Sequence, residues 1–485
     1  PDYLQEHGYH AGYTGKGVGP FFWALGGRET DPAGEEYALR KNDPPYDHIS
    51  DIDYAANFED FIGKRPDGQP FYFWYGAHEP HRRFQEGAGE LAGKQPETAT
   101  VPSFLPEVDP VRTDLLDYAN EIEWFDAHLG RIIRKLEEIG ELDNTIIIAT
   151  ADNGMAFPAA KANGREYGIH VPFAVRWGDR VRPDRVVDDL VSFVDVTPTL
   201  FEVAGIQPPE ALPFSGKSFT NILLSDRQGL VDPSRKAVFS ARERHSSSRY
   251  YNLSYPMRAM RTQDYLLVWN CRPERWPAGA PTQLVNGQEV DAYTDVDWTP
   301  EHNLSMLYLM KNRSNPEVEP LTRNAFGKRP EFELFDIRQD PGCTKNLVED
   351  PELAQVKDQL ISELKAYLKE TDDPRMDPAR QHEFESHRRY ANIREFPAAD
   401  WTEEMAETEL AEIKEWADRD TEPTVAPVSI GEWGVQTNRW KLVKEEAGWK
   451  LFDILADPEL QEDLSRMKGK TTSNLVQYYR YWQNN

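Results

Sequence analysis

The sequence predicts an α/β fold: a large, mainly parallel sheet flanked by helices, followed by a smaller antiparallel sheet subdomain with a helix. Two apolar runs, at residues 71–75 and 146–148, end abruptly in polar residues. Such runs are typical of strands that are buried on both faces of a parallel sheet. From about residue 235 the pattern changes to shorter strands punctuated by Gly and Pro, which favours an antiparallel unit.

Length and charge limit the possible functions. The chain has 485 residues, which is enough for two or more domains with substantial cores. The net charge of −28, from 55 basic and 83 acidic residues, disfavours nucleic acid as a partner. No apolar stretch approaches the ~20 residues of a membrane span, so none is predicted. We expect a large α/β domain at 1–232, an α+β subdomain at 233–375, and an acidic helical linker with a second partial sheet unit at 376–485.

The N-terminal part begins with a predicted helix, a short strand and a glycine-rich turn that carries Lys16. Taken alone, Lys16 can also be a solvated lysine in a turn. Residues 50–62 then predict an amphipathic helix for which Ser50 is a suitable N-cap.

The strand at 71–75 leads into a polar segment that contains His78, His81 and Arg82. In open α/β sheets ligands bind beyond the carboxyl ends of the strands, so we expect this segment at the rim of a site. The two histidines have the spacing of a zinc pair, but Pro80 would disrupt the helix on which such a pair normally lies. A zinc site is therefore disfavoured here; a histidine, with a pKa near ~6.5, is able to donate a hydrogen bond or to transfer a proton.

Two later helices are predicted. Residues 111–140 place apolar side chains three or four positions apart, which is typical of one long helix packed on the sheet. Within it, Asp126 and His128 are expected to face solvent or neighbouring helices. A further helix start is expected at Asp195, which has the pattern of an N-cap.

The strand at 146–148 ends in Asp152, Asn153 and Gly154. A carboxylate beside an amide oxygen, with a glycine that permits a sharp exit, suits a hard cation such as calcium. Asp-Asn-Gly is also common turn chemistry, so the tripeptide alone leaves a simple strand-ending turn open.

In the smaller subdomain we expect strands at 257–262, 265–270 and 333–337 and a helix at 352–370. The tail repeats this pattern weakly, with strand-like segments at 439–443 and 450–454 that are each followed by related Asp-containing turns. We interpret the tail as a second partial sheet unit packed on the first, or as a coincidence of common strand patterns. Between the copies, residues 400–422 are acidic and predicted helical, and 423–428 are predicted to form a linker.

Two more residues follow the central tripeptide: Lys161, and His170 in a Tyr-Gly-Ile-His-Val-Pro segment. Residues 145–172 resemble the sulfatases of the alkaline phosphatase superfamily, and most closely the sulfamidase (heparan N-sulfatase) branch. Those proteins carry D-N-G followed by F-P and a basic residue at this spacing, and the resemblance extends over most of residues 1–375. It implies an alkaline-phosphatase-like fold, Ca²⁺ ligated by Asp152 and Asn153, and contact between Lys161 and the sulfate.

The same resemblance assigns roles to the other candidate residues. Lys16 would lie beside the nucleophile and stabilise its anionic form. The family's F-H-x-P-H-R segment matches here, which implies that His78 donates a hydrogen bond or a proton to the leaving group. His81, Arg82 and His170 would contact the substrate. Many sulfatases have a histidine soon after the lysine, whereas this chain has a glycine-rich stretch there.

The activity that the resemblance implies is calcium-dependent hydrolysis of a sulfate ester or sulfamate in a sulfated carbohydrate, through a formylglycine nucleophile. The family's nucleophilic cysteine lies in a segment that precedes Lys16 and is absent from this sequence, so this chain alone is expected to be inactive. A periplasmic or secreted location is also implied. The alternatives are a phosphoesterase or phosphonate hydrolase of the same superfamily and a catalytically inactive carbohydrate-binding protein. The oligomeric state is left open.

Cys271 begins a Cys-Arg-Pro-Glu-Arg segment that matches the C-x-P-x-R pattern of the formylglycine precursor. Its position argues against that role, because the family nucleophile precedes Lys16 and caps a helix whose N–H groups favour an anion. Cys271 instead follows a predicted strand of the smaller subdomain. We therefore expect an ordinary small core cysteine.

Overall fold

We analysed a computed structural model of the chain. The structure describes residues 1–485 except 19–22, 24–27, 29, 209–213, 247, 250–252, 286, 296–301, 382, 385–395, 397–427, 430–433, 437–439, 447, 455, 469–471, 473–474, 477–478 and 480–485. The acidic segment predicted to be helical at 400–422 lies outside the described residues, as does nearly all of the predicted linker.

The large domain contains a parallel three-stranded sheet with the order β2-β1-β3. Its strands are β1 (His10–Gly15), β2 (Glu35–Glu36) and β3 (Phe71–Gly76). A second, antiparallel pair is formed by β4 (Ile147–Thr150) and β5 (Phe173–Arg176). Gly15 is paired with Gly76, so β1 and β3 end at the same level.

The strands of the large domain are less buried than the sequence predicts. All four residues of β4 are half-buried, and Trp74 of β3 is 45% exposed. The physical reason is their place at sheet edges: among the described residues β3 is paired with β1 alone and β4 with β5 alone. An edge strand leaves part of each side chain uncovered even where its sequence is apolar throughout.

The helix α2 (Tyr54–Lys64) begins four residues after the predicted start. Asp53 caps it, because its carboxylate accepts a hydrogen bond from the Ala56 N–H at 2.9 Å. Ser50 is therefore not the N-cap; its hydroxyl accepts a bond from the Ile52 N–H instead. Both residue types are good caps, and Asp53 prevails here because it also pairs with Arg131 of the neighbouring long helix.

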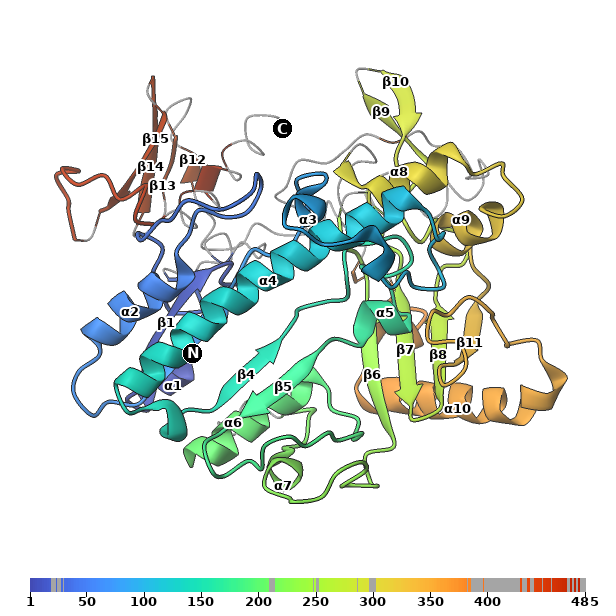
Figure 1. The fold of residues 1–485 in the computed structure, drawn as a ribbon, viewed down its shortest axis with the longest axis horizontal. Helices are drawn as coiled ribbons and strands as arrows, with labels where there is room; N and C mark the ends of the chain where they lie inside the picture. The colour runs from blue at the N-terminus through green and yellow to red at the C-terminus, as the bar shows by residue number, and fades with distance from the viewer. Residues whose placement is uncertain are drawn as a thin grey trace.

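That long helix, α4 (Asp109–Glu138), confirms the prediction for 111–140 and crosses the molecule from α8 to α2 (Figure 1). Its C-terminal half contributes Ile132 and Leu136 to an apolar core with α2 and β3. The apolar stripe is only partly buried, since Ile122 is 40% exposed. Several buried positions are polar instead: Asp114, Asp117, Asn120, Glu121 and His128. Of the two predicted environments for His128, the structure shows contact with a neighbouring helix, α2.

The remaining helices of the large domain are short. They are α1 (Asp2–Glu6), α3 (Ala88–Leu91), α5 (Glu166–Ile169), α6 (Val196–Ala204) and α7 (Thr220–Leu223). The helix start predicted at Asp195 is confirmed, since Asp195 holds the N-cap position of α6, but its side chain makes no capping hydrogen bond to that helix. Its carboxylate accepts bonds from the N–H groups of Ser192 and Lys217 and pairs with Arg235, so it joins α6 to the following turn rather than capping the helix.

The predicted smaller subdomain is confirmed as a four-stranded antiparallel sheet with the order β11-β8-β7-β6. One face is covered by α10, which buries Leu360, Leu364 and Leu368 against it. The opposite face packs against Ile169, at the end of α5. The elements are β6 (Ala237–Arg242), β7 (Met257–Thr262), β8 (Tyr265–Asn270), β9 (Thr282–Val285), β10 (Gln288–Asp291), α8 (Leu304–Lys311), α9 (Glu319–Phe326), β11 (Phe332–Asp336) and α10 (Ala354–Glu370).

The tail forms a separate sheet with the order β12-β13-β14-β15. Its strands are β12 (Val428–Ser429), β13 (Gly434–Gln436), β14 (Trp440–Glu445) and β15 (Gly448–Asp453). The predicted packing of this unit on the smaller subdomain is not what the structure shows. Its core instead contains Trp23, which is 2% exposed and lies seven residues after Lys16.

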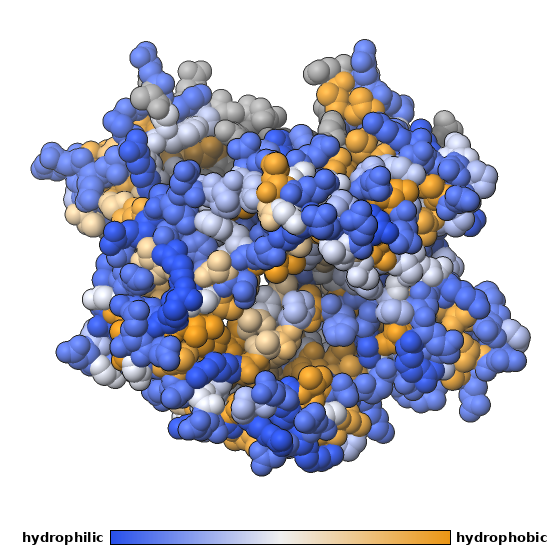
Figure 2. All heavy atoms as spheres, viewed as in Figure 1, coloured by the Kyte–Doolittle hydropathy of each residue, from blue (hydrophilic) through white to orange (hydrophobic). Residues whose placement is uncertain are grey.

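No helix in the described part of the chain is long and apolar enough to cross a membrane. The visible surface is largely hydrophilic, with apolar residues also showing on the face occupied by β4 and β5, beneath α4 (Figure 2).

Candidate active site

The candidate site lies where β1, β3 and β4 end. Lys16 follows β1, and its backbone N–H donates to the carbonyl oxygen of Gly76 at the end of β3, 2.5 Å away. The Nζ of Lys16 lies 2.6 Å from the Oδ2 of Asp152, two residues beyond β4. The polar ends of three strands are thus brought together, as the sequence predicts for an α/β sheet.

The Lys16–Asp152 pair is partly solvated, because 29% and 61% of the two side chains are exposed. An ion pair of this kind contributes roughly 0–1 kcal/mol to stability. Partial desolvation opposes ionisation of Asp152, but the hydrogen bond from Lys16 and the positive charges of Lys16 and Lys161 outweigh it. The pKa of Asp152 is therefore held below its usual range. The carboxylate is ionised and faces two ammonium groups.

Lys161 reaches this group from a tight loop between β4 and α5. It is 7% exposed, and its backbone N–H donates to the carbonyl oxygen of Met155 at 3.0 Å. Gly154 allows the loop to close: a Cβ at this position would lie 1.7 Å from the carbonyl oxygen of Tyr167. The glycine of the Asp-Asn-Gly tripeptide is thus needed for a close backbone approach.

Asn153 is half-buried, and its Nδ2 donates to the carbonyl oxygen of Gly154 at 2.8 Å. This bond uses the amide nitrogen, so the amide oxygen beside the Asp152 carboxylate is the atom suited to a hard cation. Among the described residues, no group of three or more His, Cys, Asp or Glu side chains is placed to hold a metal ion. The donor types, a carboxylate and an amide oxygen, are those that fit a hard cation such as calcium.

His78 lies two residues beyond Gly76, with an exposed side chain and a firmly held backbone. Its N–H donates to the hydroxyl of Tyr54 at 3.0 Å, and that hydroxyl donates to Glu79 Oε2 at 2.8 Å. The other oxygen of Glu79 accepts from the Ser50 N–H at 2.7 Å. Sequence reasoning missed Tyr54 and Glu79; the one available signal was the acidic residue directly after His78.

The predicted substrate residues lie in different environments. The Nδ1 of the exposed His81 is 2.6 Å from the Arg82 carbonyl oxygen. Arg82 is buried; its guanidinium makes two 2.7 Å bonds to Asp114, and its Nε donates to the Ala156 carbonyl. Through its bond to the Ala156 carbonyl, Arg82 supports the backbone of the Lys161 loop. His170 is 69% exposed, and its bond to Glu166 raises the pKa of the imidazole.

Cys271 directly follows β8 in the smaller subdomain, as expected. Burial raises the pKa of its thiol to about 12. A thiol with this pKa stays protonated at neutral pH, as in an inert core cysteine.

The sequence model of the sulfatase family matches residues 1–206, and that of the N-sulphoglucosamine sulphohydrolase C-terminal region matches residues 163–276. An ulvan-active sulfatase of Formosa agariphila is 26% identical over 304 residues, which cover 62% of this chain and 46% of that protein. N-sulphoglucosamine sulphohydrolase of Homo sapiens is 26% identical over 340 residues, covering 64% and 62%. The chain thus spans about half the length of the curated relatives that it matches.

One similar solved structure is a protein in complex with its substrate D-glucosamine-2-N,6-O-disulfate. It has a TM-score of 0.50 and 16% identity, and the match covers 77% of this chain and 82% of that one. This likeness concerns the fold. The sulfatase model therefore places residues 1–206 in the sulfatase family, and the structural likeness shows that the chain has the alkaline-phosphatase-like α/β fold.

Proposed function

We propose that the complete protein is a sulfatase that hydrolyses a sulfate ester or a sulfamate in a sulfated saccharide. The observation that carries this proposal is the convergence of Lys16, Asp152 and Lys161 beyond the ends of β1 and β4. The ammonium groups of Lys16 and Lys161 both act on the Asp152 carboxylate and bring positive charge to this place in a chain whose net charge is −28. Such a site can attract a sulfate group over a short range despite the overall field, which salt screens beyond about 10 Å.

The proposed roles follow from position. Lys16 and Lys161 would neutralise the oxygens of the bound sulfate, whose charge increases in the transition state. His78 has an exposed side chain, and its backbone N–H is bonded to Tyr54. Its imidazole would protonate the departing oxygen or nitrogen. His81 and His170, which are exposed, stay predicted substrate residues, whereas Arg82, with its guanidinium bonded to Asp114 and Ala156, would act by holding the Lys161 loop.

Sulfatases generally use a metal ion. We propose that Asp152 and Asn153 hold calcium here, because they offer an ionised carboxylate and an amide oxygen. When bound, the ion would supply further positive charge against the sulfate oxygens. Lys16 would then keep Asp152 ionised and oriented.

The nucleophile is proposed to be a formylglycine outside the 485 residues of this chain. Neither cysteine of this chain lies at the ends of β1, β3 and β4, because Cys271 follows β8 and Cys343 follows β11 in the smaller subdomain. The names of two matches, the N-sulphoglucosamine sulphohydrolase region and the human relative, favour an N-sulfated or O-sulfated amino sugar as the substrate. A periplasmic or secreted location is proposed from the same relatives.

The test is a substrate panel for the full-length protein. We expect release of sulfate from N-sulfoglucosamine or glucosamine 6-sulfate and little release of phosphate from p-nitrophenyl phosphate. Phosphate-ester turnover far above sulfate turnover would favour the phosphoesterase alternative. Binding of the sulfated sugar without any turnover, in protein shown by mass spectrometry to carry formylglycine, would favour the inactive carbohydrate-binding alternative.

A further inference from the structure

The loop that carries Lys161 has an unusual backbone. Ala159 has φ 65° and Ala162 has φ 57°, so two alanines in the left-handed region bracket the lysine. Residues other than Gly, Asn and Asp rarely adopt this conformation. They keep it only where contacts with the surrounding structure impose it. Contacts that hold the loop from outside are therefore needed to keep Lys161 in place.

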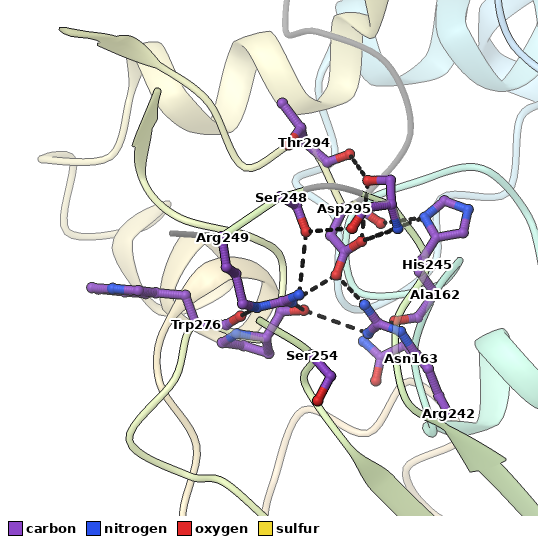
Figure 3. A network of polar contacts seen from close by, with 12 residues as sticks. Ala162, Asn163, Arg242, His245, Ser248, Arg249, Ser254, Trp276, Thr294 and Asp295 are labelled. Atoms are coloured by element: carbon purple, nitrogen blue, oxygen red, sulfur yellow. Dashed lines mark hydrogen bonds and ion pairs between the residues drawn. The ribbon is translucent and has the colours of Figure 1, made fainter. Parts of the chain in front are cut away.

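One such contact comes from Arg242, the last residue of β6 in the smaller subdomain. Its Nη1 donates a short hydrogen bond to the carbonyl oxygen of Ala162, directly after Lys161 (Figure 3). Its Nη2 is paired with Asp295, whose side chain is 0% exposed. The Arg242 guanidinium, which is held by Asp295, thus extends from the smaller subdomain to the large domain and binds the backbone of the loop.

Asp295 fixes the direction of this guanidinium. The same carboxylate oxygen also accepts from Arg249 Nη2 at 2.6 Å, and Oδ1 accepts from the Ser246 N–H at 3.1 Å. Burial opposes ionisation of Asp295, but the charges of Arg242 and Arg249 outweigh it and hold its pKa well below the usual range. Arg249 donates to the carbonyl oxygens of Trp276 and Pro277, and none of its hydrogen bonds or ion pairs with described residues reaches the Lys161 loop (Figure 3).

Two further residues of the loop, Asn163 and Arg165, contact the smaller subdomain through their side chains. The Oδ1 of Asn163 accepts from Arg329 Nη1 at 2.9 Å. Arg165 pairs with Glu333 of β11 at 2.5 Å and donates to the Asn324 carbonyl at 3.0 Å. Positions 162, 163 and 165 are therefore each attached to the smaller subdomain.

We infer that Arg242, oriented by Asp295, is a positioning residue for Lys161, so that the smaller subdomain sets the geometry of the sulfate site. The inference rests on the proposed function for its effect on catalysis. Its structural part, the restraint of the loop, can be measured without a substrate.

The experiment compares Arg242→Ala with Arg249→Ala in the full-length protein. Both variants remove one buried partner of Asp295, and only the first removes the bond to Ala162. Hydrogen exchange, followed by mass spectrometry, should become faster in peptides that cover residues 157–163 in Arg242→Ala and stay unchanged there in Arg249→Ala. Equal exchange in the two variants would overturn the inference. Arg242→Lys, which keeps a positive charge beside Asp295 but lacks the forked guanidinium that bonds Asp295 and Ala162 together, replaces Arg242→Ala if the latter does not fold.

The activity arm is a double-mutant cycle. Arg242→Ala should lower kcat by about 10–100-fold with a smaller change in KM, because misplacing a transition-state contact by about 1 Å can cost 10²-fold. In a Lys161→Met background the same substitution should have no further effect. Independent, multiplied losses would show that Arg242 acts other than through Lys161. If the wild-type protein releases no sulfate, the proposed function fails, while the exchange comparison still decides whether the loop is held.

Discussion

Lys16 and Asp152, which are 136 positions apart in the sequence, form an ion pair with 2.6 Å between Nζ and Oδ2. This contact joins the end of the parallel sheet at β1 to the end of β4. Because both side chains are partly exposed, the pair contributes little to stability, and its effect is to place charge. The proposed sulfate site depends on this placement of the Lys16 and Asp152 charges.

Calcium binding should depend on Asp152 and Asn153. Replacing either residue by Ala removes one oxygen from a hard-cation site, so calcium affinity should fall in each variant. The measurement is calorimetric calcium titration of the full-length variants. Asp143→Ala is a matched control, since Asp143 is an exposed aspartate paired with Arg176. Wild-type affinity in both site variants would remove these residues from the metal site.

His78→Ala should lower the turnover of the full-length enzyme by about 10²–10⁴-fold, the usual loss when a proton donor is removed. The melting temperature should change little, because the His78 side chain is exposed. His81→Ala is the matched control and should lose less. Equal losses in the two variants would mean that the proton donor has been assigned to the wrong histidine.

Tyr54→Phe tests the support of His78. Loss of the hydroxyl removes the partner of the His78 N–H and leaves Glu79 with one bond fewer. We expect a lower kcat and an altered pH dependence of kcat. The free energy of unfolding should fall by about 1 kcal/mol, the usual cost of one buried hydrogen bond. Steady-state kinetics across pH check this; an unchanged pH profile would contradict it.

Glu121 of α4 should make stability depend on pH. Burial, together with the charges of Glu79 and Asp117, raises its pKa to about 8. Because the folded pKa lies above the ordinary value of 4.5, the contribution of Glu121 is fully present below about pH 4.5 and is lost as the pH rises toward 8. Glu121→Gln should therefore raise the melting temperature more at pH 8 than at pH 5.

The control for this experiment is Glu123→Gln, because the Glu123 side chain is 66% exposed on the same helix. Its effect on the melting temperature should be the same at both pH values. A Glu121→Gln effect that does not change between pH 5 and pH 8 would show that Glu121 is ionised in the folded protein.

Cys271→Ser should keep the activity of the full-length protein. Cys271 is partly buried directly after β8, and burial raises the pKa of its thiol to about 12, which leaves it protonated. Mass spectrometry should find cysteine, and no formylglycine, at this position. Formylglycine at 271 together with loss of activity in Cys271→Ser would show that the C-x-P-x-R pattern had been correct and the argument from position wrong.

The sequence was sufficient to predict the strand ends and the smaller sheet. At β3 and β4 an apolar run stops at polar residues, and this local change needs no knowledge of partners. The rule that polar residues gather beyond strand ends predicted that His78 and Asp152 lie at the rim of a site. The place of Lys16 came from the family resemblance and not from a local pattern, because a lysine in a glycine-rich turn is as often simply solvated.

The supporting contacts could not be predicted, because each joins residues far apart in the chain. Asp53 rather than Ser50 caps α2, and its second partner, Arg131, lies 78 positions away. Likewise, Arg242 and Asp295 are 53 positions apart, and the Ala162 carbonyl that Arg242 binds is 80 positions from it. Side-chain composition alone gives no preference among many possible carboxylates and carbonyls.

The most direct test of the central claim is the rate of sulfate release by full-length Lys161→Met, compared with Lys217→Met as an exposed-lysine control. If Lys16, Asp152 and Lys161 form the sulfate site, kcat/KM in Lys161→Met should fall by about 10²–10³-fold, the usual cost of one lost charge-stabilising contact. Lys217→Met should keep the wild-type value. A Lys161→Met enzyme that is folded and as active as the control would contradict the account.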